Sequence, residues 1–177
     1  MVRRIPTVLA AALMLLLAAC GDDGTAGGTN DVVTVTAVDY QFRALPAQVR
    51  AGTRLALTND SRREVHELAA MRLPDGETRT ATELLALPEA ELRPALGGPP
   101  AAVLVAPPGE AGFTALGDGT LTQRGRYLFV CFIPTGADPP AFLAAVAAAR
   151  SSGGPPSSVP GGAPHFTAGM YAELTVR

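Results

Sequence analysis

From Val32 onward the chain is a succession of short apolar runs, separated by turns rich in Gly, Pro, Asn and Asp. Val32 to Val38 alternates Val and Thr, a β-branched pattern typical of a strand. Arg126 to Cys131 is aromatic or apolar almost throughout and predicts a buried strand. Many short strands divided by such turns favour an all-β sandwich. The further predicted strands are Arg54–Thr58, Glu64–Ala69, Val103–Val105, Gly112–Leu116, Thr120–Leu121 and Met170–Val176, with Tyr40–Phe42 as an extension of the first strand.

Two segments have helical rather than strand-like patterns. Thr80 to Leu92 combines Leu84, Leu85 and Leu87 with acidic residues and predicts a helix interrupted at Pro88, followed by a loop from Pro94 to Pro100. Ala141 to Arg150 is rich in alanine and predicts a second helix. The next segment, Ser151 to Pro164, is of low complexity, and we expect it to be mobile. The sandwich therefore carries short helical insertions.

The N-terminus has the pattern of an export signal. Arg3 and Arg4 precede an uncharged apolar run from Val8 to Ala19, which is too short for a stable membrane span. The run ends in Leu-Ala-Ala-Cys, which resembles a bacterial lipobox and predicts lipidation of Cys20. An ordinary secretory signal with a chance cysteine, or an uncleaved anchor, are the alternatives. The predicted division is a signal peptide at 1–19, a lipidated cysteine and flexible tether at 20–31, and one domain at 32–177.

The chain has two cysteines. If Cys20 carries lipid, Cys131 is a lone thiol in an oxidising compartment, where it could be buried and inert, paired with another chain, or a metal ligand. The formal net charge is -2, and there is no lysine and no large basic cluster after Arg4. The charge pattern gives no indication of a nucleic-acid partner.

Four side chains suit a single metal. His66 and His165 are the only two histidines, and Cys131 and Met170 supply a thiol and a thioether. Two imidazoles, a thiolate and a weak axial thioether are the ligand set of copper sites that transfer electrons. The sequence shows neither a phosphate-binding glycine loop nor the nucleophile elbow of a hydrolase, so we do not expect an enzyme.

At these residues the chain resembles the plastocyanins, which are type 1 blue copper cupredoxins. Gly125 to Cys131, with Pro134 after it, is similar to their strand before the copper cysteine. His165 to Met170, with four residues between His and Met, is similar to their last ligand loop, and Ala51 to His66 is similar to their first histidine segment. The resemblance implies a Greek-key β-sandwich that binds one copper ion through His66, Cys131, His165 and an axial Met170. It also implies one-electron transfer at the outer face of a membrane, to a redox partner protein that the sequence does not identify.

The resemblance also suggests roles for two neighbours of the ligands. Glu67, beside His66, stands where the family often has a residue that stabilises the ligand loop. Phe166, beside His165, is expected in an apolar patch where a partner docks. Two other functions share the same four residues: a copper carrier or store without redox duty, and a metal-free module that binds another protein.

The chain departs from the plastocyanin pattern between Cys131 and His165. An insertion of 33 residues, Phe132 to Pro164, separates these two ligands, and the question is whether His165 returns to the metal. Loop closure becomes costlier only slowly with length, so an insertion of this size is tolerable. We expect its helix, with Phe142, Leu143 and Val146 on one face, to cap the copper end of the sandwich; the alternative is a disordered loop.

Overall fold

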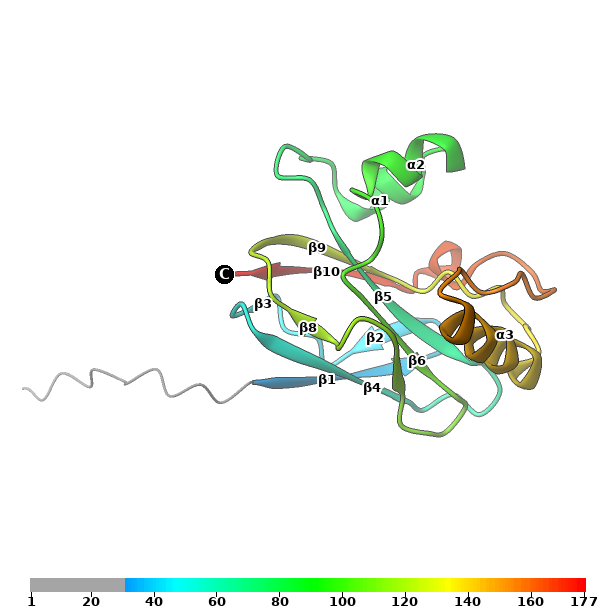
Figure 1. Ribbon diagram of the computed structural model, residues 1–177. Helices are drawn as coiled ribbons and strands as arrows, with labels where there is room; N and C mark the ends of the chain where they lie inside the picture. The colour runs from blue at the N-terminus through cyan, green and yellow to red at the C-terminus, as the bar shows by residue number, and fades with distance from the viewer. Residues whose placement is uncertain (1–30) are drawn as a thin grey trace, which may run out of the picture.

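The computed structural model describes residues 31–177, which form two β-sheets with helices at one face and one end (Figure 1). The smaller sheet has the order β2 (Gln41–Arg43), β1 (Val32–Val38), β4 (Thr53–Asn59) and β8 (Thr120–Leu121). The larger sheet has the order β3 (Gln48–Val49), β10 (Tyr171–Val176), β9 (Gly125–Val130), β5 (His66–Arg72), β6 (Ala102–Ala106) and β7 (Phe113–Leu116). The pairs β1–β4 and β3–β10 are parallel, and the other pairs are antiparallel. The predicted Greek-key β-sandwich with short helical insertions is confirmed.

The main core lies between the two sheets, because alternate residues of each strand point inward. On β5, Leu68 and Ala70 belong to this core, and the alternation puts the buried His66 on the same side, while Ala69 and Met71 face the other side. The predicted strand began at Glu64, but the sheet pairing begins at His66. His66 is therefore the first residue of a central strand, with its side chain inside the sandwich.

Strand β9 is buried on both faces, as its continuous apolar sequence predicts. Tyr127 and Phe129 pack in the main core, and Leu128 and Val130 pack in a second cluster on the outer face of the larger sheet. Pairing with β10 ends at Val130, so Cys131 is the first residue after the strand.

The second cluster lies under α1 (Ala81–Leu85) and α2 (Glu89–Ala95), which cross the outer face of the larger sheet (Figure 1). Thr80 and Glu83 form a capping box at the start of α1, and the break falls at Pro88 as predicted. The predicted start of the loop at Pro94 is wrong by two residues, because α2 continues through Pro94 to Ala95. Burial of Leu92 and Leu96 against the sheet offsets the hydrogen bond that a proline lacks.

Helix α3 (Pro139–Ser152) lies at one end of the sandwich, next to β7 (Figure 1). Asp138 caps its first turn, and Gly153 ends it in the left-handed conformation. The buried face consists of Phe142, Ala145, Val146 and Ala149. The predicted face included Leu143, which is only half-buried, because residues at i, i+3, i+4 and i+7 share a side of a helix.

The predicted signal peptide, Cys20 and nearly all of the predicted tether lie outside the described residues. Within residues 31–177, none of the helices has the length and apolar character needed to cross a membrane.

Candidate metal centre

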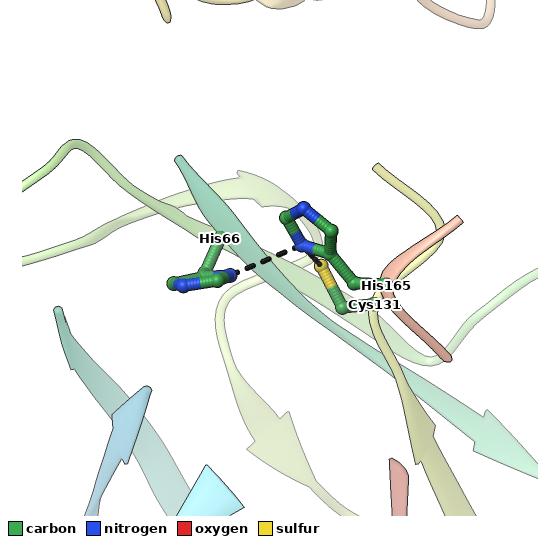
Figure 2. Close-up of side chains that lie close together, drawn as sticks. All are labelled: His66, Cys131 and His165. Carbon is green, nitrogen blue, oxygen red and sulfur yellow. Dashed lines mark hydrogen bonds between the residues drawn. The ribbon is translucent and has the colours of Figure 1, made fainter. Parts of the chain in front are cut away.

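Three side chains from separate parts of the chain meet inside the sandwich. His66 begins β5, Cys131 follows β9, and His165 opens the 3-10 turn η1 (His165–Ala168). All three are fully buried, and their donor atoms lie within 4.8 Å of one another. Figure 2 shows both imidazoles and the thiol directed toward a common centre. This is the arrangement that a single metal ion requires of three ligands.

The atoms that meet are Nδ1 of each histidine and Sγ of the cysteine. His66 Nδ1 lies 3.1 Å from His165 Nδ1, which in turn lies 3.2 Å from Cys131 Sγ (Figure 2). Each imidazole therefore presents the same ring nitrogen to the centre, and its Nε2 faces away. Imidazole nitrogens and a soft thiolate are a donor set compatible with a copper site.

The long insertion does not keep His165 away, because its two ends are joined by hydrogen bonds. Thr135 N–H donates to Ala163 O at 3.0 Å, and His165 N–H donates to Ile133 O at 2.9 Å. Phe166 N–H donates to Cys131 O at 3.0 Å, so the residue after His165 is tied to the backbone of Cys131. The rest of the insertion extends from this closed base. His165 thus returns to the cluster.

Two glycines permit the close approach at this base. A Cβ on Gly161 would lie 2.5 Å from Pro134 Cβ and 3.0 Å from Thr135 O, distances that side chains do not tolerate. Gly162 N–H also donates to Thr135 O at 2.8 Å. The Gly-rich composition of this segment therefore has a structural reason that sequence analysis did not identify.

Met170 is placed beside the cluster by its backbone. Its carbonyl accepts from Cys131 N–H at 3.2 Å, and its N–H donates to His165 O at 3.2 Å. Its side chain is fully buried in the main core, which also contains Cys131. The fourth predicted ligand thus lies in the same layer as the first three.

Glu67 contacts Cys131 and the residue that follows it. Its backbone N–H donates to Cys131 Sγ at 3.4 Å, and its Oε1 accepts from Phe132 N–H at 2.9 Å. Burial raises the pKa of Glu67 to about 7, and the bond from Phe132 opposes this shift. The geometry is that of a residue that holds the ligand loop.

The outer nitrogens of the two histidines face carboxylates that sequence analysis missed. His66 Nε2 is hydrogen-bonded to Asp39 Oδ1 at 3.0 Å. His165 Nε2 lies 3.4 Å from Glu64 Oε2, and it has no hydrogen-bond partner among the described residues. A carboxylate on the outer nitrogen favours the tautomer that leaves Nδ1 free for a metal. No motif marks these acids, although Asp39 follows a predicted strand and Glu64 precedes His66 by two residues.

Burial determines the protonation of all three donors. It lowers the pKa of His66, against the hydrogen bond with Asp39, and together with repulsion from His66 it lowers the pKa of His165 to about 4. Burial also raises the pKa of the Cys131 thiol, and the negative charge of the Glu67 carboxylate raises it further. Neutral imidazoles are ready to bind metal, and a bound cation deprotonates a coordinating thiol. The residues therefore fit a metal ion.

An apolar cavity of about 910 Å³ borders the site on the outer face of the larger sheet. Phe132 and Phe166, the residues that follow Cys131 and His165, form part of its lining and meet edge to face with ring centroids 5.6 Å apart. Leu85, Leu87 and Val103 continue the lining. The predicted apolar surroundings of Phe166 are present.

No family model and no curated protein matches the chain. Among solved structures, similar backbones occur in auracyanins. The dithionite-reduced auracyanin of Roseiflexus castenholzii is 15% identical over 85% of this chain and 99% of its own, with a TM-score of 0.43. Auracyanin A of Chloroflexus aurantiacus, described as a blue copper protein, is 19% identical over 82% and 99%, with a TM-score of 0.39. Auracyanin B is 17% identical over 83% and 88%, with a TM-score of 0.35.

Proposed function

We propose that this protein is a type 1 copper protein that transfers one electron at a time. The observation that carries the proposal is the convergence of His66 Nδ1, His165 Nδ1 and Cys131 Sγ in a buried cluster. Met170 would be the axial ligand, supported by its burial in the same core and its backbone bonds to Cys131 and His165. Copper bound there would supply the change between Cu(I) and Cu(II).

The task of the chain is to keep its ligands in place through that change. His66 is fixed by the β5 pairing, Cys131 by its bonds to Met170 and Phe166, and His165 by its bond to Ile133. Full burial of the three donors excludes water, so only an outer-sphere approach by an electron partner is possible. A ligand set held rigidly between the preferences of the two oxidation states needs little rearrangement when an electron moves.

We further propose that the protein works outside the cytoplasm, anchored to the bacterial cell membrane through lipid on Cys20. The charged, apolar and small-residue segments before Cys20 support this anchor. A redox partner protein would dock near Phe132 and Phe166, since these residues follow two ligands directly and border an apolar cavity. The near-balanced charge of the chain gives no support to a nucleic-acid partner.

Metal analysis and visible spectroscopy test the function. Copper-loaded protein should contain about one copper per chain and show an intense thiolate-to-copper charge-transfer band. Cys131→Ser should lose the band, because the domain has no other thiol. A protein that binds no copper would be a metal-free binding module, and one that binds copper without this band, or without measurable electron self-exchange, would be a carrier or store.

A further inference from the structure

The tip of the β1–β2 hairpin lies over both histidines. Asp39 and Tyr40 are the two residues between these strands, and both lie against the imidazoles; the Tyr40 ring also meets the His66 ring edge to face, with centroids 6.4 Å apart. Asp39 Oδ1 lies 3.0 Å from His66 Nε2. The Tyr40 ring packs on the His165 ring, with centroids 4.7 Å apart and planes inclined by 49°. One turn thus covers the outer side of the metal centre.

Glu64 holds this cover in place. Its Oε1 accepts from Tyr40 Oη at 3.3 Å, and its two oxygens accept from Gly136 N–H at 3.2 and 3.1 Å. Its backbone carbonyl accepts from Asn59 Nδ2 at 2.8 Å, which fixes the loop before β5. The carboxylate therefore joins the hairpin tip to the insertion beside His165 Nε2.

The result is that His165 has no edge in contact with solvent. Its side chain is 0% exposed, and its Nε2 is buried although it forms no hydrogen bond within residues 31–177. Tyr40 is only half-buried, so its ring is the layer between His165 and the surface. A solute that approaches His165 from the side of the hairpin must first displace Tyr40 or Glu64.

We propose that Tyr40, held by Glu64, closes the outer edge of His165 against solutes and redox partners. This inference deepens the proposed function and rests on it for its meaning, since it closes the approach to the metal from the side of the hairpin. A different approach, from the outer cavity, runs through Phe132 and Phe166, which follow Cys131 and His165 and line that cavity. Tyr40 is a shielding and positioning residue and does not bind the metal.

Chemical labelling of the copper-free protein tests this closure directly. Diethyl pyrocarbonate modifies accessible neutral imidazoles, and peptide mass spectrometry separates His66 from His165. We expect slow labelling of His165 in the wild-type protein, and acceleration of about tenfold or more in Tyr40→Ala, because a buried ring reacts only through local opening. Tyr40→Phe should restore much of the protection, since it keeps the ring and loses only the bond to Glu64.

Tyr171→Ala is the matched control, because Tyr171 is also half-buried and bonded through its hydroxyl, in its case to Thr82 Oγ1 at 3.0 Å. It should leave His165 labelling slow. If Tyr40→Ala fails to fold by circular dichroism, Glu64→Ala is the second variant: it removes the carboxylate beside His165 Nε2 and its bonds from Gly136 N–H, and it should also speed labelling of His165. Wild-type labelling at the rate of urea-unfolded chain, or equal rates in the wild type and the folded variants, would overturn the proposal. Since no copper is present, this result is independent of whether the loaded protein is coloured.

Discussion

The backbone N–H of Glu67 points at Sγ of Cys131 from 3.4 Å, while the carboxylate of the same residue accepts from the N–H of Phe132. Glu67 therefore contacts two consecutive residues, the side chain of Cys131 and the backbone of Phe132. Its side chain lies on the outer face of β5, opposite the inward-facing His66. The strand neighbour of His66 thus supports the segment that holds Cys131.

Removal of this carboxylate should loosen the loop. Glu67→Ala leaves the Phe132 N–H without its acceptor, and we expect a loss of about 1–3 kcal/mol in the free energy of unfolding. Glu67→Gln is the matched variant, because its amide oxygen can accept the same bond, and it should stay close to the wild type. Urea unfolding of copper-free protein measures both. Equal losses in the two variants would show that the bond to Phe132 is not what matters.

The base of the insertion should be sensitive to a single methyl group. In Gly161→Ala the new Cβ meets Pro134 Cβ at 2.5 Å, so the two ends of the insertion must separate. Because His165 is tied to Ile133 just beyond this point, we expect weaker copper binding and a diminished visible band. Copper titration measures the effect. Gly154→Ala is the control: its Cβ would meet only Ser152 Oγ at 3.6 Å, so its titration should match the wild type. A copper titration of Gly161→Ala that matches the wild type would contradict this account of how the insertion is closed.

The buried face of α3 should determine which truncations are costly. Phe142 is 8% exposed and belongs to the main core, whereas the adjacent Leu143 is half-buried at its margin. We expect Phe142→Ala to cost about 3–5 kcal/mol in urea unfolding, as a large side chain removed from a core does. Leu143→Ala should cost clearly less. The reverse order would place Leu143 on the inner face, as the sequence pattern suggested.

Sequence patterns predicted the strands and the candidate ligands for definite physical reasons. The run before Cys131 is apolar throughout because β9 is buried on both faces, and such a run is visible without a structure. His66, Cys131, His165 and Met170 were predicted as ligands from their residue types and from motifs that resemble those of plastocyanins, since few side chains can bind copper. These are properties of single residues and their neighbours in the chain.

The supporting contacts could not be predicted in this way. Asp39 meets His66 across 27 residues, and Tyr40 meets His165 across most of the domain, because a hairpin tip happens to lie above both rings. An ordinary Asp-Tyr turn carries no sign of that placement. The glycines at 161 and 162 suggested mobility, whereas their lack of a Cβ permits close packing against Pro134 and Thr135. Such contacts depend on tertiary structure, which local patterns do not encode.

Stability at acid pH should depend on Glu77, far from the metal centre. Hydrogen bonds from Arg79, first from its side chain and then from its backbone, lower the pKa of Glu77 from 4.5 to about 2. Its backbone carbonyl also accepts from Arg126 Nη1 at 2.8 Å, which ties the segment before α1 to β9. A carboxylate whose pKa is depressed on folding stabilises the native state above its unfolded pKa, and this contribution disappears as the pH falls through the folded value.

We therefore expect the wild type to exceed Glu77→Gln in free energy of unfolding above pH 5, with a difference that shrinks between pH 4.5 and about 2. Urea unfolding of the copper-free proteins across this range measures the difference. Copper-free protein is used because acid could otherwise lower stability by releasing bound copper. A difference that stays constant down to pH 2, or grows as the pH falls, would mean that the Glu77–Arg79 pair does not contribute through the ionised carboxylate.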